Sequence, residues 1–403
     1  METDIKKICV MGMGYIGLPT SALLANRGFQ VHGVDINPKT IEIINQGKIH
    51  IVEPELDTFV KAAVESGKLK ASLAPAEADV FVLAVPTPFH KDSGDTPRPN
   101  IDYVLAATEA IVPFVKEGNI VILESTSPVG TTDEIARVLR EGGIDTDHVH
   151  VAHCPERVLP GHIMRELIEN DRVVGGTTPE ATKVTAAFYR TFVEGEVLET
   201  EARTAEMAKL TENSCRDVQI AFANELSLIC DKMDIDVWEL IRLSNRHPRI
   251  NILTPGVGVG GHCIAVDPWF IVDSDPENSQ LIRKGREVNL RKTEWVIEKI
   301  KSAAGKLGKE KPVVALMGLA FKPDIDDLRE SPAVHIANAL KSVRGMDLLF
   351  VEPNITEHPD FKLTTVDTAC EQADLVVFLV RHKAFVELLD IKGRVLDFCG
   401  VKE

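Results

Sequence analysis

The chain has 403 residues, of which 44% are hydrophobic and 26% charged, and its formal net charge is −16 at pH 7. This length allows about two or three domains, and the acidic charge disfavours nonspecific binding to nucleic acid, which needs a basic surface. No apolar run approaches the roughly 20 residues that span a bilayer. The N-terminus has no signal-peptide pattern, and the seven cysteines lack the paired spacing of disulfide frameworks or metal sites. We therefore expect a cytoplasmic protein without a metal.

The first half of the sequence alternates short apolar segments with helical stretches. Strands are predicted at residues 7–11, 31–35, 80–85, 120–124 and 149–152. These segments are rich in β-branched residues and short enough to be buried parallel strands. The alternation predicts the α/β class, with a Rossmann-like, doubly wound parallel sheet over residues 1–200.

Two long helical regions follow, at about residues 204–244 and 279–304, with a glycine-rich loop between them. The first region carries apolar residues around much of its circumference, which is typical of a helix buried on several sides. We therefore expect a central helical domain over residues 201–304 that contributes to a homodimer or higher homo-oligomer.

The polar segment 305–312 has the composition of a domain boundary. Beyond it the alternation restarts, with strands predicted at 313–317, 347–351, 375–380 and 395–398. The run Val314-Ala-Leu-Met-Gly-Leu-Ala resembles Ile8-Cys-Val-Met-Gly-Met-Gly near the N-terminus. We expect a second Rossmann-like domain over residues 305–403.

A dinucleotide-binding motif occupies the first predicted strand–helix junction. The sequence Gly12-Met-Gly-Tyr-Ile-Gly17 follows the strand directly, and Asp35 ends the second strand. Such glycines permit a tight turn and a close approach of the pyrophosphate, while the acid binds ribose hydroxyls and repels a 2′-phosphate, which favours NAD over NADP. Thr87 and Thr126 follow two further strands at the same edge, either as nicotinamide contacts or as ordinary turn residues. The predicted NAD contacts are Gly12, Gly14, Tyr15, Ile16, Gly17, Asp35, Thr87 and Thr126.

The loop at residues 256–270 has four glycines in its first six positions and presents Cys263, with Asp267 four residues later. Glycine is unfavourable in helices and strands and is useful where backbone approaches a ligand. Cys263 is therefore a candidate nucleophile, with an inert core cysteine as the alternative. Lys209, Asn213 and Arg216 share one face of the first long helix, either as a solvated surface or as the wall of a cleft.

Together these motifs resemble the UDP-glucose/GDP-mannose dehydrogenase family, the nucleotide-sugar 6-dehydrogenases, over essentially the whole chain. The matching stretches are residues 14–20, 33–37, 84–89, 124–130, 154–161, 203–214, 258–270 and 321–332. Within the family, the segments Cys-Pro-Glu-Arg157 and Arg-His-Pro-Arg249 resemble the subgroup that oxidises acetamido sugars.

The resemblance implies that NAD oxidises the sugar C6 alcohol twice, to a carboxylate. It implies that Cys263 traps the aldehyde as a thiohemiacetal and then forms a thioester, while Lys209 and Asn213 stabilise the negative oxygen. The implied base for the first oxidation is Lys209 or a water held by Asp267. The implied base for hydrolysis of the thioester is Glu156 or Asp267. The implied substrate is UDP-N-acetylmannosamine, with UDP-N-acetylglucosamine or UDP-glucose as alternatives. A silent nucleotide-sugar sensor is the alternative that is not an enzyme.

The second Rossmann-like domain lacks GxGxxG at residues 318–322, so we expect it to bind the UDP part and not a second dinucleotide. The resemblance also implies that Arg329 contacts NAD. It assigns the nucleotide-sugar to Arg157, Val158, Lys209, Asn213, Arg216, His247, Arg249, Gly260, Phe321 and Lys322. Several of these residues are cationic, as recognition of a diphosphate requires.

Overall fold

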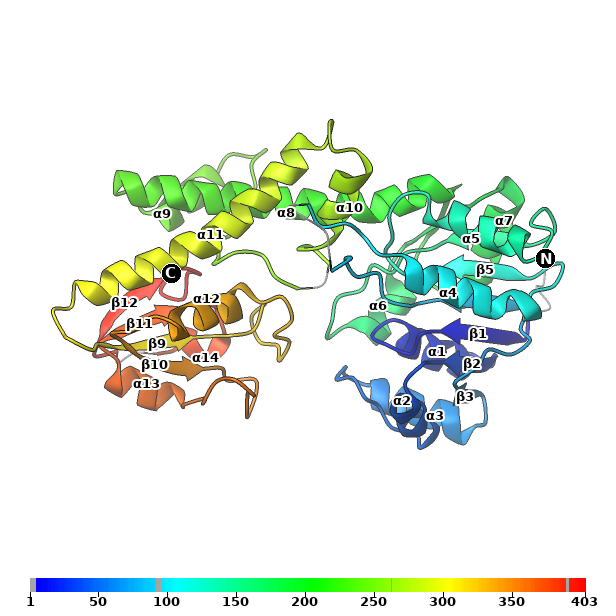
Figure 1. Cartoon of the computed structure of the whole chain (residues 1–403), viewed down its shortest axis with the longest axis horizontal. Coiled ribbons are helices and arrows are strands. Elements are labelled where there is room, and N and C mark those ends of the chain that lie inside the picture. Colours follow the sequence, from blue (N-terminus) through cyan, green and yellow to red (C-terminus); the bar gives the residue numbers. More distant parts are fainter. Residues whose placement is uncertain (1–4, 92–95, 262, 389–390) are drawn as a thin grey trace. The chain divides into compact units, whose positions relative to one another are not determined.

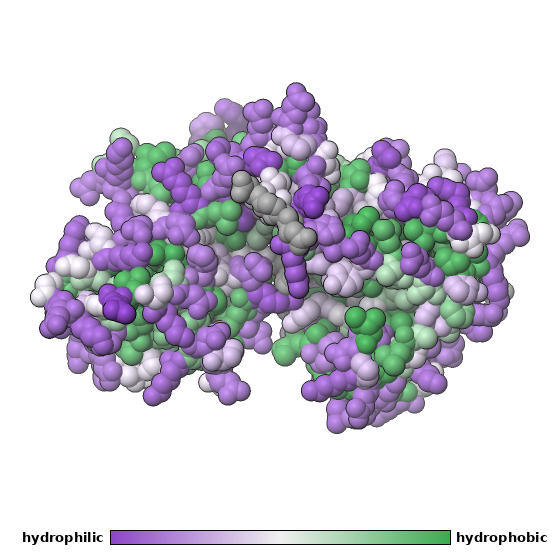
Figure 2. Space-filling view, in the orientation of Figure 1, coloured by the Kyte–Doolittle hydropathy of each residue, from purple (hydrophilic) through white to green (hydrophobic). Residues whose placement is uncertain are grey.

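The computed structural model describes residues 5–91, 96–261, 263–388 and 391–403. Its contacts divide the chain into two compact units: unit 1 is Met1–Thr211 with Trp269–Ser274, and unit 2 is Glu212–Pro268 with Asp275–Glu403. Hydrophilic side chains cover most of the face seen in Figure 2, in keeping with the acidic composition. Within the described ranges, no helix is long and apolar enough to cross a membrane. The division into three domains at residues 200 and 304 stays a prediction.

Unit 1 is built on a sheet of eight strands in the order β3-β2-β1-β4-β5-β6-β7-β8 (Figure 1). All neighbouring strands are parallel except β6 and β7. The strands are β1 (Lys7–Met11), β2 (Gln30–Val34), β3 (Leu69–Ser72), β4 (Val80–Leu83), β5 (Ile120–Leu123), β6 (His150–His153), β7 (Arg172–Gly176) and β8 (Val197–Glu201). The helices are α1 (Gly17–Asn26), α2 (Pro38–Asn45), α3 (Leu56–Glu65), α4 (Asp102–Ile111), α5 (Thr131–Glu141), α6 (Ile163–Glu169) and α7 (Pro179–Tyr189), with the 3-10 turn η1 (Val112–Phe114).

The predicted N-terminal strands are confirmed to within two residues at each end. The central strands β1, β4 and β5 are buried on both faces, which explains their nearly continuous apolar sequence. Three strands were not predicted. β3 is short, β7 ends in two glycines and the edge strand β8 exposes most of its residues, so none of them forms a long apolar run.

Unit 2 holds a second sheet, of four parallel strands in the order β10-β9-β11-β12. Its strands are β9 (Val313–Met317), β10 (Asp347–Val351), β11 (Leu375–Phe378) and β12 (Arg394–Asp397). The remaining helices are α8 (Ala202–Met233) and α10 (Asp267–Ser274), which both units share, and α9 (Val237–Ser244), α11 (Gln280–Gly305), α12 (Pro332–Lys341), α13 (Val366–Gln372) and α14 (Lys383–Val386). The doubly wound α/β class, with a second parallel sheet and a helical centre, is confirmed.

The long helix α11 belongs to the core of unit 2. Its buried residues Val296, Ile297 and Ile300 share one hydrophobic cluster with Val314 and Leu316 of β9. The helix therefore packs against the C-terminal sheet, and the polar segment at 305–312 lies inside unit 2.

The region predicted to be helical from 204 to 244 contains two helices. The first, α8, ends at Met233, and Asp234 adopts the left-handed conformation with φ of 55°. The carboxylate of Asp236 then accepts hydrogen bonds from the backbone N–H groups of Trp238 and Glu239, at 2.9 and 3.3 Å. Aspartate is favoured at both positions, because it tolerates the left-handed region and caps a helix well.

Candidate active site

The turn after β1 has the geometry that a dinucleotide needs. Gly12 has φ of +94°, and a Cβ there would lie 2.6 Å from the carbonyl oxygen of Ala84. A Cβ at Gly17, the first residue of α1, would lie 1.8 Å from the Gly12 carbonyl oxygen. At Gly14, in contrast, the Cβ position has no atom within 4 Å. Gly12 and Gly17 are thus required by the fold, whereas Gly14 leaves open space beside the N-terminus of α1, and a helix N-terminus of this kind suits a pyrophosphate.

Asp35 follows β2 and is fixed beside this turn. One carboxylate oxygen accepts the N–H of Met13 at 3.1 Å, and the other accepts the N–H of Asn37 at 2.9 Å. The side chain is half-buried at the carboxyl end of the strand. The turn, the helix N-terminus and the acid therefore fit NAD, whose adenosine ribose is bound by such an acid.

The loops after β4 and β5 are tied together at the same edge of the sheet. The hydroxyl of Thr87 donates to the carbonyl of Thr126 at 2.6 Å, and Ser125 donates to the carbonyl of Val85 at 2.6 Å. The structure thus places Thr87 and Thr126 side by side. Their contact with nicotinamide stays a prediction.

The first turns of α8 are anchored to the N-terminus of α5. The carboxylate of Glu206 accepts the backbone N–H groups of Gly130 at 2.6 Å and Thr132 at 2.7 Å, and the Thr132 hydroxyl at 2.5 Å. Lys209 lies one turn later, 9% exposed, and its charge acts on His153 at the end of β6. Burial, with a smaller contribution from Lys209, lowers the pKa of His153 to about 3 and keeps the imidazole neutral. Sequence reasoning missed Glu206, whose partners lie more than 70 residues away.

Glu156 lies in a buried ion pair, which the sequence did not predict. Its carboxylate accepts a hydrogen bond from Arg172, whose guanidinium also donates to the carbonyl of Leu167 at 2.8 Å. The side chains of Glu156 and Arg172 are only 5% and 3% exposed. Arg172 also acts on Glu124, whose pKa is raised by burial and lowered less by the charge of Arg172. The carboxylate that the resemblance implicated in hydrolysis is thus already paired with a cation.

The segment that follows Glu156 is fixed by backbone contacts. Arg157 donates to the carbonyl of Asp171 at 2.5 Å, and the Arg157 carbonyl accepts the amide of Asn170 at 3.1 Å. Val158 is half-buried and packs against the main core of unit 1. Both predicted substrate residues therefore lie on an ordered loop at the carboxyl end of β6.

In unit 2, Cys263, Asp267 and Asn213 form a compact cluster. The backbone N–H of Asp267 donates to the carbonyl of Cys263 at 2.8 Å, so the two residues share one helical turn at the start of α10. The amide of Asn213, on α8, donates to the carboxylate of Asp267 at 2.5 Å. Cys263 is exposed, whereas Asp267 is buried. An exposed cysteine before the positive end of a helix, one turn from a fixed carboxylate, suits a nucleophile.

The glycine loop before Cys263 packs against the segment after β9. A Cβ at Gly260 would lie 2.5 Å from the carbonyl oxygen of Glu330 and 2.9 Å from the Phe321 Cβ. Gly261 has φ of +83°, and its Cβ would lie 2.9 Å from the Phe321 ring. The N–H of Gly261 also donates to the carbonyl of Arg329 at 3.3 Å. The structure thus brings Gly260 and Phe321 together, while residue 262 lies outside the described residues.

The other predicted ligand-binding residues lie on the surface of unit 2. Arg216, His247 and Arg249 are exposed, and Lys322 is half-buried next to Phe321. The turn that carries His247 and Arg249 is closed by Asn245, which exchanges two hydrogen bonds with the backbone of Ile252, at 2.7 and 2.9 Å. Arg329 pairs with Asp327 at 2.6 Å. Their roles in binding stay predictions.

The turn after β9 differs from its counterpart after β1. Glu352, at the end of β10, accepts the N–H groups of Leu319 and Ala320 at 2.7 and 2.9 Å, and contacts His382 at 3.1 Å. Burial alone would raise the pKa of Glu352, but the hydrogen bonds with His382 and the two amides lower it. Because these two amides are occupied by a carboxylate of the same unit, they are not available to a pyrophosphate. This agrees with the absence of a GxGxxG motif.

Comparisons with known proteins identify the family. Three models of the UDP-glucose/GDP-mannose dehydrogenase family match the chain: the NAD binding domain at residues 6–193, the central domain at 203–291 and the UDP binding domain at 315–397. The chain belongs to this family. It is an NAD-dependent nucleotide-sugar dehydrogenase, so the predictions of enzyme class and cofactor are confirmed, and the UDP binding domain coincides with the second Rossmann-like unit.

The relatives cover the chain almost completely. It is 54% identical to the UDP-N-acetyl-D-mannosamine dehydrogenase of Campylobacter jejuni, over 98% of this chain and 100% of the relative. It is 51% identical to the NDP-N-acetyl-D-galactosaminuronic acid dehydrogenase of Ralstonia solanacearum, over 96% and 93%. The solved structure of the UDP-N-acetyl-mannosamine dehydrogenase from Staphylococcus aureus is 42% identical and has a TM-score of 0.89, over 98% of this chain and 95% of that one.

Proposed function

We propose that the chain oxidises UDP-N-acetyl-D-mannosamine at C6 to the uronate. The support is its 54% identity over the full length to a dehydrogenase named for this substrate. A relative named for N-acetyl-D-galactosaminuronic acid is 51% identical, so an acetamido sugar of another configuration is the second candidate. UDP-N-acetylglucosamine and UDP-glucose are the further alternatives.

The observation that carries the chemistry is the cluster of Cys263, Asp267 and Asn213. We assign the thiolate of Cys263 to attack on the C6 aldehyde, which gives a thiohemiacetal and, after loss of the second hydride, a thioester. Bound NAD supplies the hydride acceptor in both oxidations. Lys209 and the Asn213 amide stabilise the negative charge on the C6 oxygen. Hydrolysis of the thioester returns the thiol and releases the carboxylate.

Two carboxylates compete for the role of base in the hydrolysis. Arg172 already pairs with Glu156 in a buried ion pair, which a role as base would have to disrupt. Asp267 shares a helical turn with Cys263 and is oriented by Asn213. We therefore assign the activation of water to Asp267, and to Glu156 the task of fixing the loop that carries Arg157.

The test is the number of NADH molecules formed per UDP-N-acetylmannosamine consumed. We expect two for the wild type and loss of turnover for Cys263→Ser, while Cys215→Ser, which changes another exposed cysteine, keeps two. One NADH per sugar, or an active Cys263→Ser enzyme, would refute the thiol mechanism. Faster turnover of another sugar would refute the substrate assignment, and no NADH with any sugar would favour the silent sensor.

We also propose that the enzyme is a cytoplasmic homodimer. Phe222, Ile229 and Met233 recur on one face of α8 and are 53%, 46% and 63% exposed in the single chain. Exposed apolar faces of this kind favour subunit contacts, and a second copy of the chain offers the matching surface. Light scattering should give twice the chain mass for the wild type and the mass of one chain for Phe222→Asp with Ile229→Asp.

A further inference from the structure

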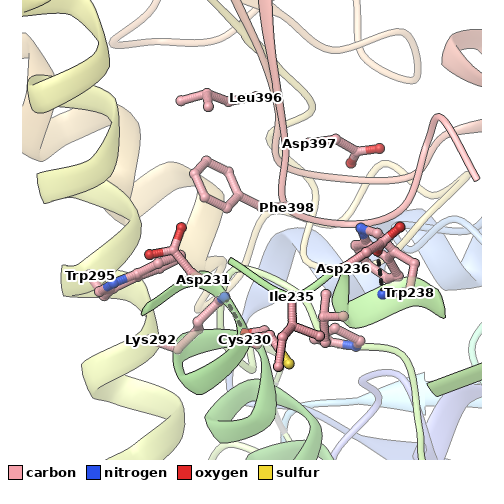
Figure 3. A pocket seen from close by; sticks show the side chains of 13 residues that line it. Cys230, Asp231, Ile235, Asp236, Trp238, Lys292, Trp295, Leu396, Asp397 and Phe398 are labelled. Carbon is pink, nitrogen blue, oxygen red and sulfur yellow. Dashed lines mark hydrogen bonds between the residues drawn. The ribbon is translucent and has the colours of Figure 1, made fainter. Parts of the chain in front are cut away.

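Unit 2 contains a cavity of about 250 Å³ away from the cysteine cluster. Residues of α8, α9, α11 and β12 line it, and Figure 3 shows Phe398 and Trp295 beside Lys292 and Asp231. Asp231 follows Asn213 by 18 residues on α8, which is about 27 Å along the axis at 1.5 Å per residue. The cavity is therefore a separate place in the unit and has no part in the proposed chemistry.

Lys292 is the buried cation of this cavity. The residue is 2% exposed, and its ammonium donates to the hydroxyl of Ser227 at 2.6 Å and lies 4.3 Å from the centre of the Trp295 ring. In the described part of the chain, no carboxylate forms an ion pair with it. Burial lowers the pKa of Lys292 to about 7, while the nearby charges of Asp231 and Lys299 act in opposite directions. A buried charge without a counter-ion is costly, so this ammonium would gain from an anionic partner.

The three carboxylates around the cavity already have hydrogen-bond or ion-pair partners. Asp231 pairs with Lys299 at 2.5 Å, and Asp236 caps the N-terminus of α9. Asp397 accepts three backbone N–H groups, from residues 399, 400 and 402, at 2.8 to 3.0 Å. Each of these carboxylates thus already has a cation or backbone N–H donors as partners, whereas the ammonium of Lys292 has, among the described residues, only the Ser227 hydroxyl and aromatic rings.

We propose that this cavity binds a small molecule that carries one carboxylate on an apolar body, and that the carboxylate pairs with the ammonium of Lys292. The rings of Trp295 and Phe398, with the side chains of Ile235 and Leu396, supply an apolar wall. The volume is below the roughly 300–1,000 Å³ of pockets for drug-sized ligands, which excludes a nucleotide-sugar. A neutral ligand of the same shape would leave the ammonium without a counter-ion, so charge is the basis of selection.

The site adjoins the base of the catalytic loop. Pro255 lines the cavity, and the next residue, Gly256, donates its N–H to the side chain of Asn224 at 2.9 Å. Thr293, the neighbour of Lys292 on α11, donates to the carbonyl of Val257 at 2.8 Å. A ligand in the cavity would therefore contact the start of the loop that leads to Cys263.

The experiment is calorimetric titration of the full-length enzyme with phenylacetate and with phenylacetamide, its neutral isostere. At pH 6.5 we expect phenylacetate to bind roughly tenfold more tightly, because a hydrogen bond between ions is the stronger kind. At pH 8.5 the preference should fall severalfold, since most of Lys292 is then uncharged. Neither titration requires turnover, so the outcome does not depend on the proposed function.

Three variants separate this site from adventitious binding. Lys292→Met and Lys292→Gln should remove the preference for phenylacetate, and the glutamine keeps a donor for Ser227 if methionine disturbs the fold. Lys301→Met is a matched change on α11, where the lysine pairs with Glu298, and it should retain the preference for phenylacetate. Equal binding of the two probes to the wild type, no binding of either at pH 6.5, or a preference retained by both Lys292 variants would overturn the proposal.

Discussion

Replacement of Lys292 by methionine measures how much a buried lysine without a counter-ion lowers the free energy of unfolding. Burial lowers its pKa from 10.5 to about 7. Between these two values the unfolded chain binds more protons than the folded chain, so the free energy of unfolding rises with pH across this window. The difference, 10.5 − 7 or about 3.5 pH units, corresponds to about 5 kcal/mol at 1.36 kcal/mol per unit. Of this amount, about 2 kcal/mol falls between pH 7 and pH 9.

The assay is urea unfolding at pH 7 and pH 9, followed by tryptophan fluorescence, since Trp295 lies directly against Lys292. We expect the stability of Lys292→Met relative to the wild type to be greater at pH 7 than at pH 9, by about 2 kcal/mol. Lost contacts and changed packing are the same at both pH values, so they cancel in this difference. All other titrating groups are common to the two proteins and cancel as well.

Lys301→Met is the matched control. Lys301 lies on the same helix, is 37% exposed and pairs with Glu298 across one turn, so its replacement should change stability by less than about 1 kcal/mol at either pH. If the relative stability of Lys292→Met is the same at pH 7 and pH 9, Lys292 does not titrate with a lowered pKa. The account of its environment is then wrong.

Three further predictions concern residues of unit 1 and the glycine loop of unit 2. Arg172→Met should lower the stability of unit 1 by about 3–5 kcal/mol, measured by thermal unfolding, because it leaves Glu156 buried without its cation. Gly12→Ala and Gly14→Ala should both raise the KM for NAD, but only Gly12→Ala should also lower the melting temperature, since only its Cβ meets other atoms. Gly261→Ala should lower kcat severalfold with little change in the KM for NAD, because its positive φ and the nearby aromatic ring force the cysteine loop to move.

Matched controls make these outcomes specific. Arg190→Met removes an ion pair with Glu199 whose members are 49% and 36% exposed, and should cost less than about 1 kcal/mol. Gly305→Ala adds a Cβ with no atom within 4 Å and should leave kcat unchanged. A loss of stability in Arg190→Met equal to that in Arg172→Met would contradict the argument from burial. A drop in kcat for Gly305→Ala would contradict the explanation that Gly261→Ala lowers kcat by moving the cysteine loop.

The features that could be predicted from sequence are those fixed by local backbone geometry. The turn at Gly12 to Gly17 needs a positive φ and the absence of a side chain, and the residues that meet these needs are visible in the sequence. The spacing of four residues between Cys263 and Asp267 likewise became one hydrogen-bonded turn. The break between α8 and α9 was missed, although Asp234 and Asp236 both suit a helix end, because the apolar pattern continues across it.

The contacts that could not be predicted join distant parts of the chain. Arg172 lies 16 residues from Glu156, and Glu206 lies 74 residues from Thr132. The sequence around each of these residues is compatible with an exposed charge. Only the packing of β7 beside β6, and of α8 on the start of α5, buries them and selects their partners.

The two Rossmann-like sheets show how one position in a repeated fold changes its role. In the first sheet Asp35 accepts the amide of Met13 and leaves the open space at Gly14 to a ligand. In the second sheet Glu352 is longer by one methylene, reaches the turn after β9 and accepts two of its amides through one oxygen. The acid after the second strand of each sheet thus binds one amide of the turn in the first copy and two in the second. A repeat in sequence therefore predicts a second copy of the fold, whereas the partners of this carboxylate decide whether that copy binds a dinucleotide.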